Sequence, residues 1–155
     1  MRVHVYEKGF LGVGAVLLVV IMGTLAYTSL AMGIHLPGHV QQVDPAQVRT
    51  LPPFDNPGLR QVGENRYEAV FLGSAWQFQP AEIRVPVGAH VTFIATSTDV
   101  LHGFAIERTR LNMMLIPGQV TKNDYTFTER GEHLIICHEY CGAGHHIMYG
   151  KVIVE

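Results

Sequence analysis

The chain has 155 residues, of which only 15% are charged, and its formal net charge at pH 7 is −2. This length leaves room for one domain with an appendage rather than for two full domains. No basic patch is visible in the sequence, which gives no support to nucleic-acid binding. Hydrophobic residues make up 48% of the chain, and much of this share lies in one segment near the N-terminus.

Residues 10–32 form that segment, 23 residues without a single charge. A helix of this length spans about 35 Å and crosses a hydrocarbon core of about 30 Å with some tilt. The apolar region of a cleaved signal peptide is shorter, roughly 7–15 residues, which favours a retained anchor. We therefore expect a single-pass transmembrane anchor, embedded in membrane lipid, over residues 1–34.

Basic residues predict the orientation of this anchor. Arg2 and Lys8 flank the span on its N-terminal side, and the next basic residue is Arg49. The positive-inside rule then puts the N-terminus in the cytoplasm and the rest of the chain outside. In a bacterium, this corresponds to the cell inner membrane with the remaining chain on its periplasmic face.

The rest of the chain divides in two. Residues 35–65 hold five of the eight prolines with little apolar periodicity, which predicts a Pro-rich extended tether. From residue 66 to residue 155, short β-rich runs alternate with turn residues, and no helical segment is visible. Many short strands of this kind are typical of an antiparallel sandwich or barrel. The expected strands are 67–72, 82–85, 90–96, 103–106, 112–116, 124–127, 132–137 and 149–154.

A loop between the last two expected strands carries the chemistry. It sets Cys137, Cys141, His145 and Met148 at spacings of four, four and three, and these are the only two cysteines of the chain. Soft sulfur with imidazole selects copper over hard cations, and a thioether has no role in a structural zinc site. A disulfide between the cysteines is the alternative outside the cytoplasm, but it would leave His145 and Met148 without a function. The loop therefore predicts a copper site.

Counting ligands indicates which kind of copper site. A single blue-copper ion takes one Cys, two His and a weak Met, so one thiolate is left over here. Two bridging thiolates can hold two copper ions, each with its own imidazole. His102 follows a turn and precedes an expected strand, and it is our choice for the second imidazole. His138 and His146 remain competing candidates inside the loop, although the spacing favours His145 over His146.

The pattern Cys-x-Glu-x-Cys-x3-His-x2-Met, with the upstream segment 99–102 (Asp-Val-Leu-His), resembles the dinuclear CuA site of subunit II of haem–copper cytochrome c oxidases. The single membrane span resembles the smaller subunit II of B-type, ba-haem oxidases. This resemblance implies an all-β fold, a cupredoxin-like Greek-key β-sandwich with one N-terminal transmembrane helix. It implies that two thiolates bridge the coppers, that two imidazoles bind one copper each, and that Met148 and the Glu139 carbonyl are weak ligands. The implied metal ligands are His102, Cys137, Glu139, Cys141, His145 and Met148.

The resemblance also implies a function in the respiratory chain. The subunit would accept electrons from a soluble cytochrome c or cupredoxin and pass them to haem in the large subunit I, where oxygen is reduced to water. The chain would thus be part of an enzyme whose haem and oxygen site lie in the partner. Trp76 is a candidate for the residue through which electrons arrive, and it reads equally well as a rim aromatic of the sandwich. The Glu139 carboxylate is a candidate ligand for magnesium at the contact with the large subunit, or a solvated loop glutamate.

Two alternatives remain open at this point. One is a CuA subunit attached to a nitric oxide reductase of the same superfamily, and the other is a membrane-tethered copper carrier. The sequence does not identify the electron donor, the reduction potential, the other subunits or any proton pumping. Seven basic against nine acidic residues in 66–155 predict an apolar docking surface with weak salt dependence.

Overall fold

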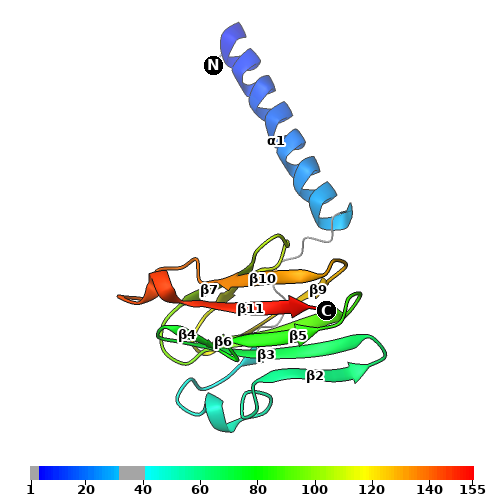
Figure 1. The fold of residues 1–155 in the computed structure, drawn as a ribbon. Helices are drawn as coiled ribbons and strands as arrows, with labels where there is room; N and C mark the ends of the chain where they lie inside the picture. Colours follow the sequence, from blue (N-terminus) through cyan, green and yellow to red (C-terminus); the bar gives the residue numbers. More distant parts are fainter. Residues whose placement is uncertain (1–3, 32–40) are drawn as a thin grey trace. The chain divides into compact units, whose positions relative to one another are not determined.

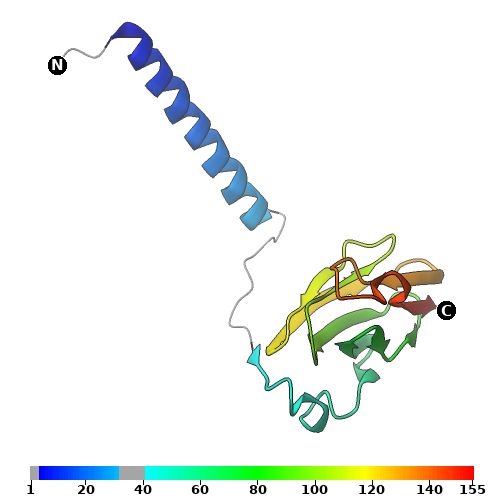
Figure 2. The ribbon, with the colours of Figure 1, turned by 90° about the vertical axis from the view of Figure 1, so that its left-hand side faces the viewer.

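The computed structural model describes residues 4–31 and 41–155, which belong to two compact units divided between residues 39 and 40 (Figures 1 and 2). Helix α1 (Val5–Ala31) forms the first unit and is long and apolar enough to cross a membrane. Its apolar side chains are exposed, as a helix that faces lipid requires. A long apolar helix is thus present over the described part of the expected span, whereas residues 1–3 and 32–34 of the predicted anchor lie outside the described residues.

The second unit is a sandwich of two sheets (Figure 1). The first sheet has the order β1-β9-β6-β3-β2 with β4 paired to β3, and the second has the order β5-β11-β10-β7-β8. The first contains β1 (Gln41–Gln42), β2 (Gly58–Gly63), β3 (Arg66–Ser74), β4 (Gln77–Gln79), β6 (His90–Ser97) and β9 (Gln119–Thr126). The second contains β5 (Glu82–Val85), β7 (His102–Ile106), β8 (Asn112–Leu115), β10 (Gly131–Ile136) and β11 (Tyr149–Val154).

All eight expected strands are present, and β5 and β11 have the expected bounds. The sandwich is confirmed, and its expected antiparallel pairing is corrected at two places, because β3 pairs with β6, and β5 with β11, in parallel. After β4 the chain crosses to the other sheet as β5 and returns as β6 in the direction of β3. A parallel pair needs such a crossover rather than a tight hairpin.

Aromatic rings fill the space between the sheets. Phe71, Phe93 and Phe104 are fully buried, and the centroids of the Phe71 and Phe104 rings lie 5.0 Å apart in an edge-to-face arrangement. Burying such a side chain contributes about 1.5–3 kcal/mol, and an aromatic pair adds about 0.5–1.5 kcal/mol. The buried cluster continues to Cys137, Cys141 and Met148, so the predicted metal loop closes one end of this core.

A second, smaller cluster corrects the expectation of an extended tether for residues 41–65. Val48, in the short 3-10 helix η1 (Val48–Thr50), and Phe54 are buried against the outer face of the first sheet. Strand β2 also pairs with β3 along its length. Turns around the prolines bring a few apolar side chains onto the sheet, so the segment packs without showing a strand or helix period. Residues 35–40 of the predicted tether lie outside the described residues. The sheet side chains of this cluster are Val70, Leu72, Ile94 and Val120.

Candidate metal centre

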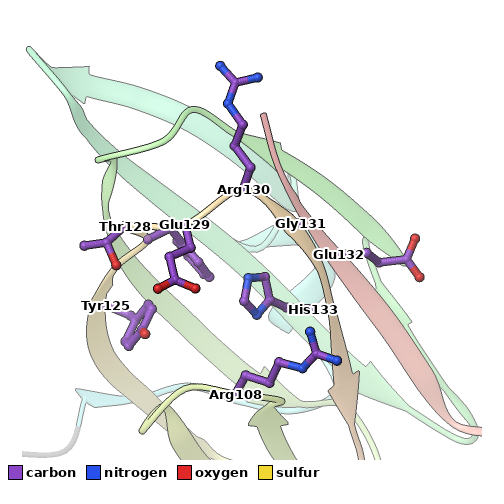
Figure 3. A pocket seen from close by; sticks show the side chains of 9 residues that line it. Arg108, Tyr125, Thr128, Glu129, Arg130, Gly131, Glu132 and His133 are labelled. Carbon is purple, nitrogen blue, oxygen red and sulfur yellow. The ribbon is translucent and has the colours of Figure 1, made fainter.

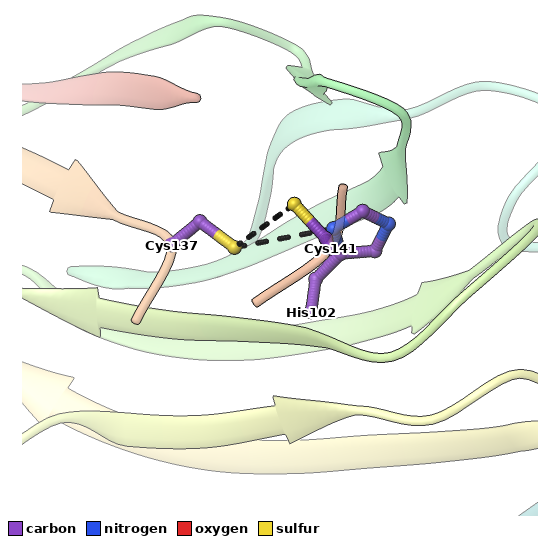
Figure 4. Close-up of side chains that lie close together, drawn as sticks. All are labelled: His102, Cys137 and Cys141. Carbon is purple, nitrogen blue, oxygen red and sulfur yellow. Dashed lines mark hydrogen bonds between the residues drawn. The ribbon is translucent and has the colours of Figure 1, made fainter. Parts of the chain in front are cut away.

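Three chain segments meet at one end of the sandwich. Strand β10 ends at Ile136 and delivers Cys137, the loop continues through the short 3-10 helix η2 (His145–Ile147), and β11 then returns. Strand β7 begins with His102, a fully buried side chain. His102 Nδ1 and the two cysteine Sγ atoms lie within 4.8 Å of one another (Figure 4).

The two thiols are free. Their sulfur atoms lie 3.8 Å apart, whereas a disulfide bond is about 2.05 Å long. The disulfide alternative is therefore not what the structure contains. Cys137 Sγ also lies 3.9 Å from His102 Nδ1.

The remaining predicted ligands surround the same sulfurs. Cys141 Sγ lies 3.6 Å from His145 Nδ1 and 3.7 Å from Met148 Sδ. The Glu139 carbonyl accepts a hydrogen bond from the Cys137 thiol at 3.3 Å. The structure thus brings every predicted ligand within 3.9 Å of a cysteine sulfur, and each cysteine has its own imidazole neighbour. His146 is exposed on the loop surface, which favours His145 as the second imidazole.

The donor atoms form a dry, soft site. His102, Cys137, Cys141 and Met148 are at most 8% exposed, and three of these side chains belong to the hydrophobic core cluster. Two sulfurs, two imidazole nitrogens and a thioether suit copper, and Met148 would be superfluous around a structural zinc ion. The residues present therefore fit a copper centre.

Asp99 orients His102. The His102 Nε2–H donates to Asp99 Oδ1 at 2.8 Å, which leaves Nδ1 facing the sulfurs. Partial burial raises the pKa of the Asp99 carboxyl, but hydrogen bonds from His102 and from the N–H groups of Val100 and Ala75 outweigh it and lower the pKa below its ordinary value. Asp99 is therefore a carboxylate at neutral pH. The sequence signal for this role was an aspartate three residues before a candidate ligand.

Burial also changes the thiol chemistry. It raises the pKa of Cys141 to about 11, and the neighbouring Cys137 thiol contributes to this rise. Without a metal the Cys141 thiol is thus protonated at neutral pH. Since a thiolate is the ligand form, metal binding must release this proton.

Trp76 lies at the rim of the site. Its Nε1–H donates to the Cys141 carbonyl at 3.2 Å, and 41% of the residue is exposed. Gly142 and Gly144 of the loop pack against its ring, where a Cβ atom on either residue would crowd the indole. The indole therefore connects the protein surface directly to the backbone of a predicted ligand.

A hollow at the opposite end of β10 has different chemistry. Its volume is about 170 Å³, and Arg108, Glu129, Arg130 and His133 are among its lining residues (Figure 3). Glu132, at its edge, pairs with Lys151 at 2.9 Å. The lining mixes both charge signs and contains no sulfur ligand, so the cluster at the other end of the sandwich is the stronger candidate for function.

Comparison with a solved structure identifies the fold of the β-domain. The domain is a cupredoxin-like sandwich and aligns, at a TM-score of 0.53 and 22% identity, with the periplasmic domain of subunit II of cytochrome oxidase from Bradyrhizobium japonicum, covering 57% of this chain and 83% of that one. This likeness gives the fold; the buried His/Cys cluster adds a copper-type ligand set, and helix α1 is long and apolar enough to anchor the chain in a membrane.

The family follows from closer relatives. Residues 77–155 match the family described as "Cytochrome C oxidase subunit II, periplasmic domain". A cytochrome c oxidase subunit 2 of Thermus thermophilus is 40% identical over 97% of this chain and 92% of its own length. A chain of a haem–copper terminal oxidase dimer, solved by cryo-EM, aligns at a TM-score of 0.77 and 35% identity over 97% of this chain and 99% of that one. The chain belongs to the cytochrome c oxidase subunit II family, and its relatives are subunits of an oxidoreductase complex.

Proposed function

We propose that this chain holds a dinuclear copper centre, accepts electrons from a soluble cytochrome c, and passes them to haem in the large subunit of a terminal oxidase. The observation that carries the proposal is the pairing of two free thiols 3.8 Å apart, each within 3.9 Å of its own imidazole nitrogen. A carrier of one exchangeable copper ion needs neither the second thiol nor the second imidazole.

The proposed roles follow from the donor atoms. Cys137, Cys141, His102 and His145 would hold the copper ions through their thiolates and imidazoles, and Met148 and the Glu139 carbonyl would be weak ligands. When bound, the metal pair supplies a one-electron couple whose charge is shared over both ions. The chain's own residues keep this couple in one geometry, because the sandwich core holds Cys137 and Met148 at 4% and 2% exposure. Little rearrangement and little water then accompany the transfer of an electron.

Exposed apolar side chains surround this end of the domain and form the proposed donor surface. Tyr140 is 81% exposed and Ile147 is 60% exposed, and both lie in the ligand loop. Trp76 completes the surface and is hydrogen-bonded to the Cys141 carbonyl. We propose that a soluble cytochrome c docks here and that its electron arrives through the indole.

Two further assignments complete the proposal. The N-terminus lies in the cytoplasm and the copper domain on the outer face of the inner membrane, because Arg2 and Lys8 precede the span. The Glu139 carboxylate, whose side chain is 40% exposed, is a ligand to magnesium at the contact with the large subunit. Metal analysis of the complex tests this role, since Glu139→Gln should then lower its magnesium content.

Copper content and paramagnetic resonance of the purified full chain test the dinuclear centre. Two coppers per chain, with hyperfine structure from one electron shared by both nuclei, are expected. One copper with an ordinary mononuclear signal would replace the electron relay with the carrier alternative. Isolation of the partner subunit, with its oxygen or nitric oxide reductase activity, separates the oxidase from a nitric oxide reductase.

A further inference from the structure

His138 lies between the two cysteines but faces away from the sulfurs. Its ring lies against Gly103, the residue that follows His102 in β7. A Cβ atom on Gly103 would come within 2.6 Å of the His138 ring, so only glycine leaves room for the imidazole there. The backbone of the ligand loop is thereby held against the strand that carries His102.

Polar contacts fix the ring in this place. His138 Nε2–H donates to the Asn112 side-chain oxygen at 2.7 Å, and Asn112 belongs to β8, the hairpin partner of β7. On the other side, His138 Nδ1 lies 3.7 Å from a carboxylate oxygen of Glu139. His138 therefore joins the β7–β8 hairpin to Glu139, whose carbonyl lies 3.3 Å from the Cys137 sulfur.

From this geometry we infer that His138, seated on Gly103 and held by Asn112, is a positioning residue that fixes the Glu139 carbonyl at the metal centre. The inference rests on the proposed dinuclear site. A peptide between two bridging ligands can rotate, and such a rotation would withdraw its carbonyl. Because a weak oxygen donor favours the oxidised centre, its withdrawal raises the reduction potential.

Three substitutions test the inference in the copper-loaded full chain. His138→Ala removes the ring, Asn112→Ala removes its acceptor, and Gly103→Ala displaces the ring without changing a polar group. At a fixed ambient redox potential, each substitution should raise the ratio of reduced to oxidised copper centre by about threefold or more. For a one-electron couple this corresponds to a reduction potential about 30 mV higher. Each should also change the copper hyperfine pattern, while the copper content stays at the wild-type value.

Two controls separate positioning from general stability. Asn112→Asp keeps an acceptor oxygen and should restore most of the wild-type potential. His133→Ala changes a hydrogen-bonded histidine at the far end of β10 and should leave the potential unchanged. An equal shift in His133→Ala, or no shift in His138→Ala and Asn112→Ala, overturns the inference. Because His138 and Asn112 lie at the surface, their variants decide the matter even if Gly103→Ala does not fold. Absence of the two-copper signal in the wild type would instead overturn the proposed function and this inference together.

Discussion

At the scale of single residues, the polarity of one hydrogen bond decides what His102 can do. Asp99 accepts from Nε2–H and is itself held by the N–H groups of Ala75 and Val100. This arrangement leaves the lone pair of Nδ1 for a metal and holds the ring at a fixed angle. Outer hydrogen-bond partners of this kind typically change metal affinity 10–100-fold.

We therefore expect Asp99→Ala to lower copper affinity by about 10–100-fold, because the imidazole loses both its tautomer preference and its orientation. Competition with a Cu(I) chelator measures this. Asp99→Asn keeps an acceptor oxygen and should lose less affinity. If the two variants bind copper as tightly as the wild type, Asp99 does not orient the ligand.

The Cys141 thiol predicts a pH dependence for the copper-free domain. Its pKa is raised to about 11 in the folded state, mainly by burial, from 9.0. Because burial penalises the folded thiolate, the unfolded chain releases this proton at a lower pH than the folded domain does. The folded state must keep a proton that the unfolded chain releases, and stability therefore falls by up to about 2 kcal/mol as the pH rises from 9 to 11.

Urea unfolding of the metal-free domain between pH 7 and pH 11 should show this loss of stability. Cys141→Ser removes the titrating thiol and should flatten the dependence. An unchanged slope in that variant would assign the loss to other groups.

At the scale of elements, the limits of sequence reasoning have identifiable causes. Short β-rich runs marked β5 and β11 to the residue, and the alternating burial of each strand puts one of its faces on the core. Strand β2 was missed because its exposed Arg60, Gln61 and Val62 form no alternation, and its pairing with β3 is what makes it a strand. The spacing of the loop located Cys137 and its neighbours, whereas the contact of His138 with Gly103 is visible only once β7 and the loop lie side by side.

The outer cluster predicts that residues before β2 stabilise the domain. Phe54 is 2% exposed and packs against the first sheet. Phe54→Ala should lower the free energy of unfolding by about 3 kcal/mol, through lost burial and a cavity. Chemical unfolding measures the loss, and the copper signal of the folded variant should stay unchanged. Leu51→Ala, at a residue 39% exposed in the same segment, should cost under about 1 kcal/mol. Equal losses in both variants would contradict the packing described for Phe54.

The boundary of the β-domain gives a second prediction at this scale. A fragment of residues 66–155 lacks β1 and β2, exposes one edge of β3, and uncovers Val70 and Ile94. An open edge and an apolar face favour aggregation. We expect the melting temperature of the fragment of residues 66–155 to lie at least about 10 °C below that of a fragment of residues 41–155. Thermal unfolding by circular dichroism compares the two fragments. Equal melting temperatures would mean that the stable domain begins at residue 66, as the proline pattern predicted.

At the scale of the whole molecule, the chain combines one apolar helix with a domain whose copper-type cluster lies under exposed apolar side chains. In residues 66–155, seven basic and nine acidic residues leave a small net charge, so long-range attraction for a charged donor is weak. Surface charges are in any case screened beyond about 10 Å at 0.1 M salt. Contact between apolar side chains must then provide most of the specificity of docking.

The rate of electron transfer from a soluble cytochrome c into the copper-loaded chain should therefore change by less than about threefold between roughly 20 and 200 mM salt. Stopped-flow reduction measures this rate.

Trp76→Ala should lower the rate of electron transfer from the cytochrome by more than about tenfold, because the indole both lies on the proposed donor surface and donates a hydrogen bond to the Cys141 carbonyl. Val62→Ala changes an exposed apolar residue on β2 and serves as the matched control, with no expected change. A steep decrease with salt would mean that charged groups steer the donor. An unchanged rate in Trp76→Ala would move electron arrival to Tyr140 or Ile147, the exposed side chains of the ligand loop that share the proposed donor surface.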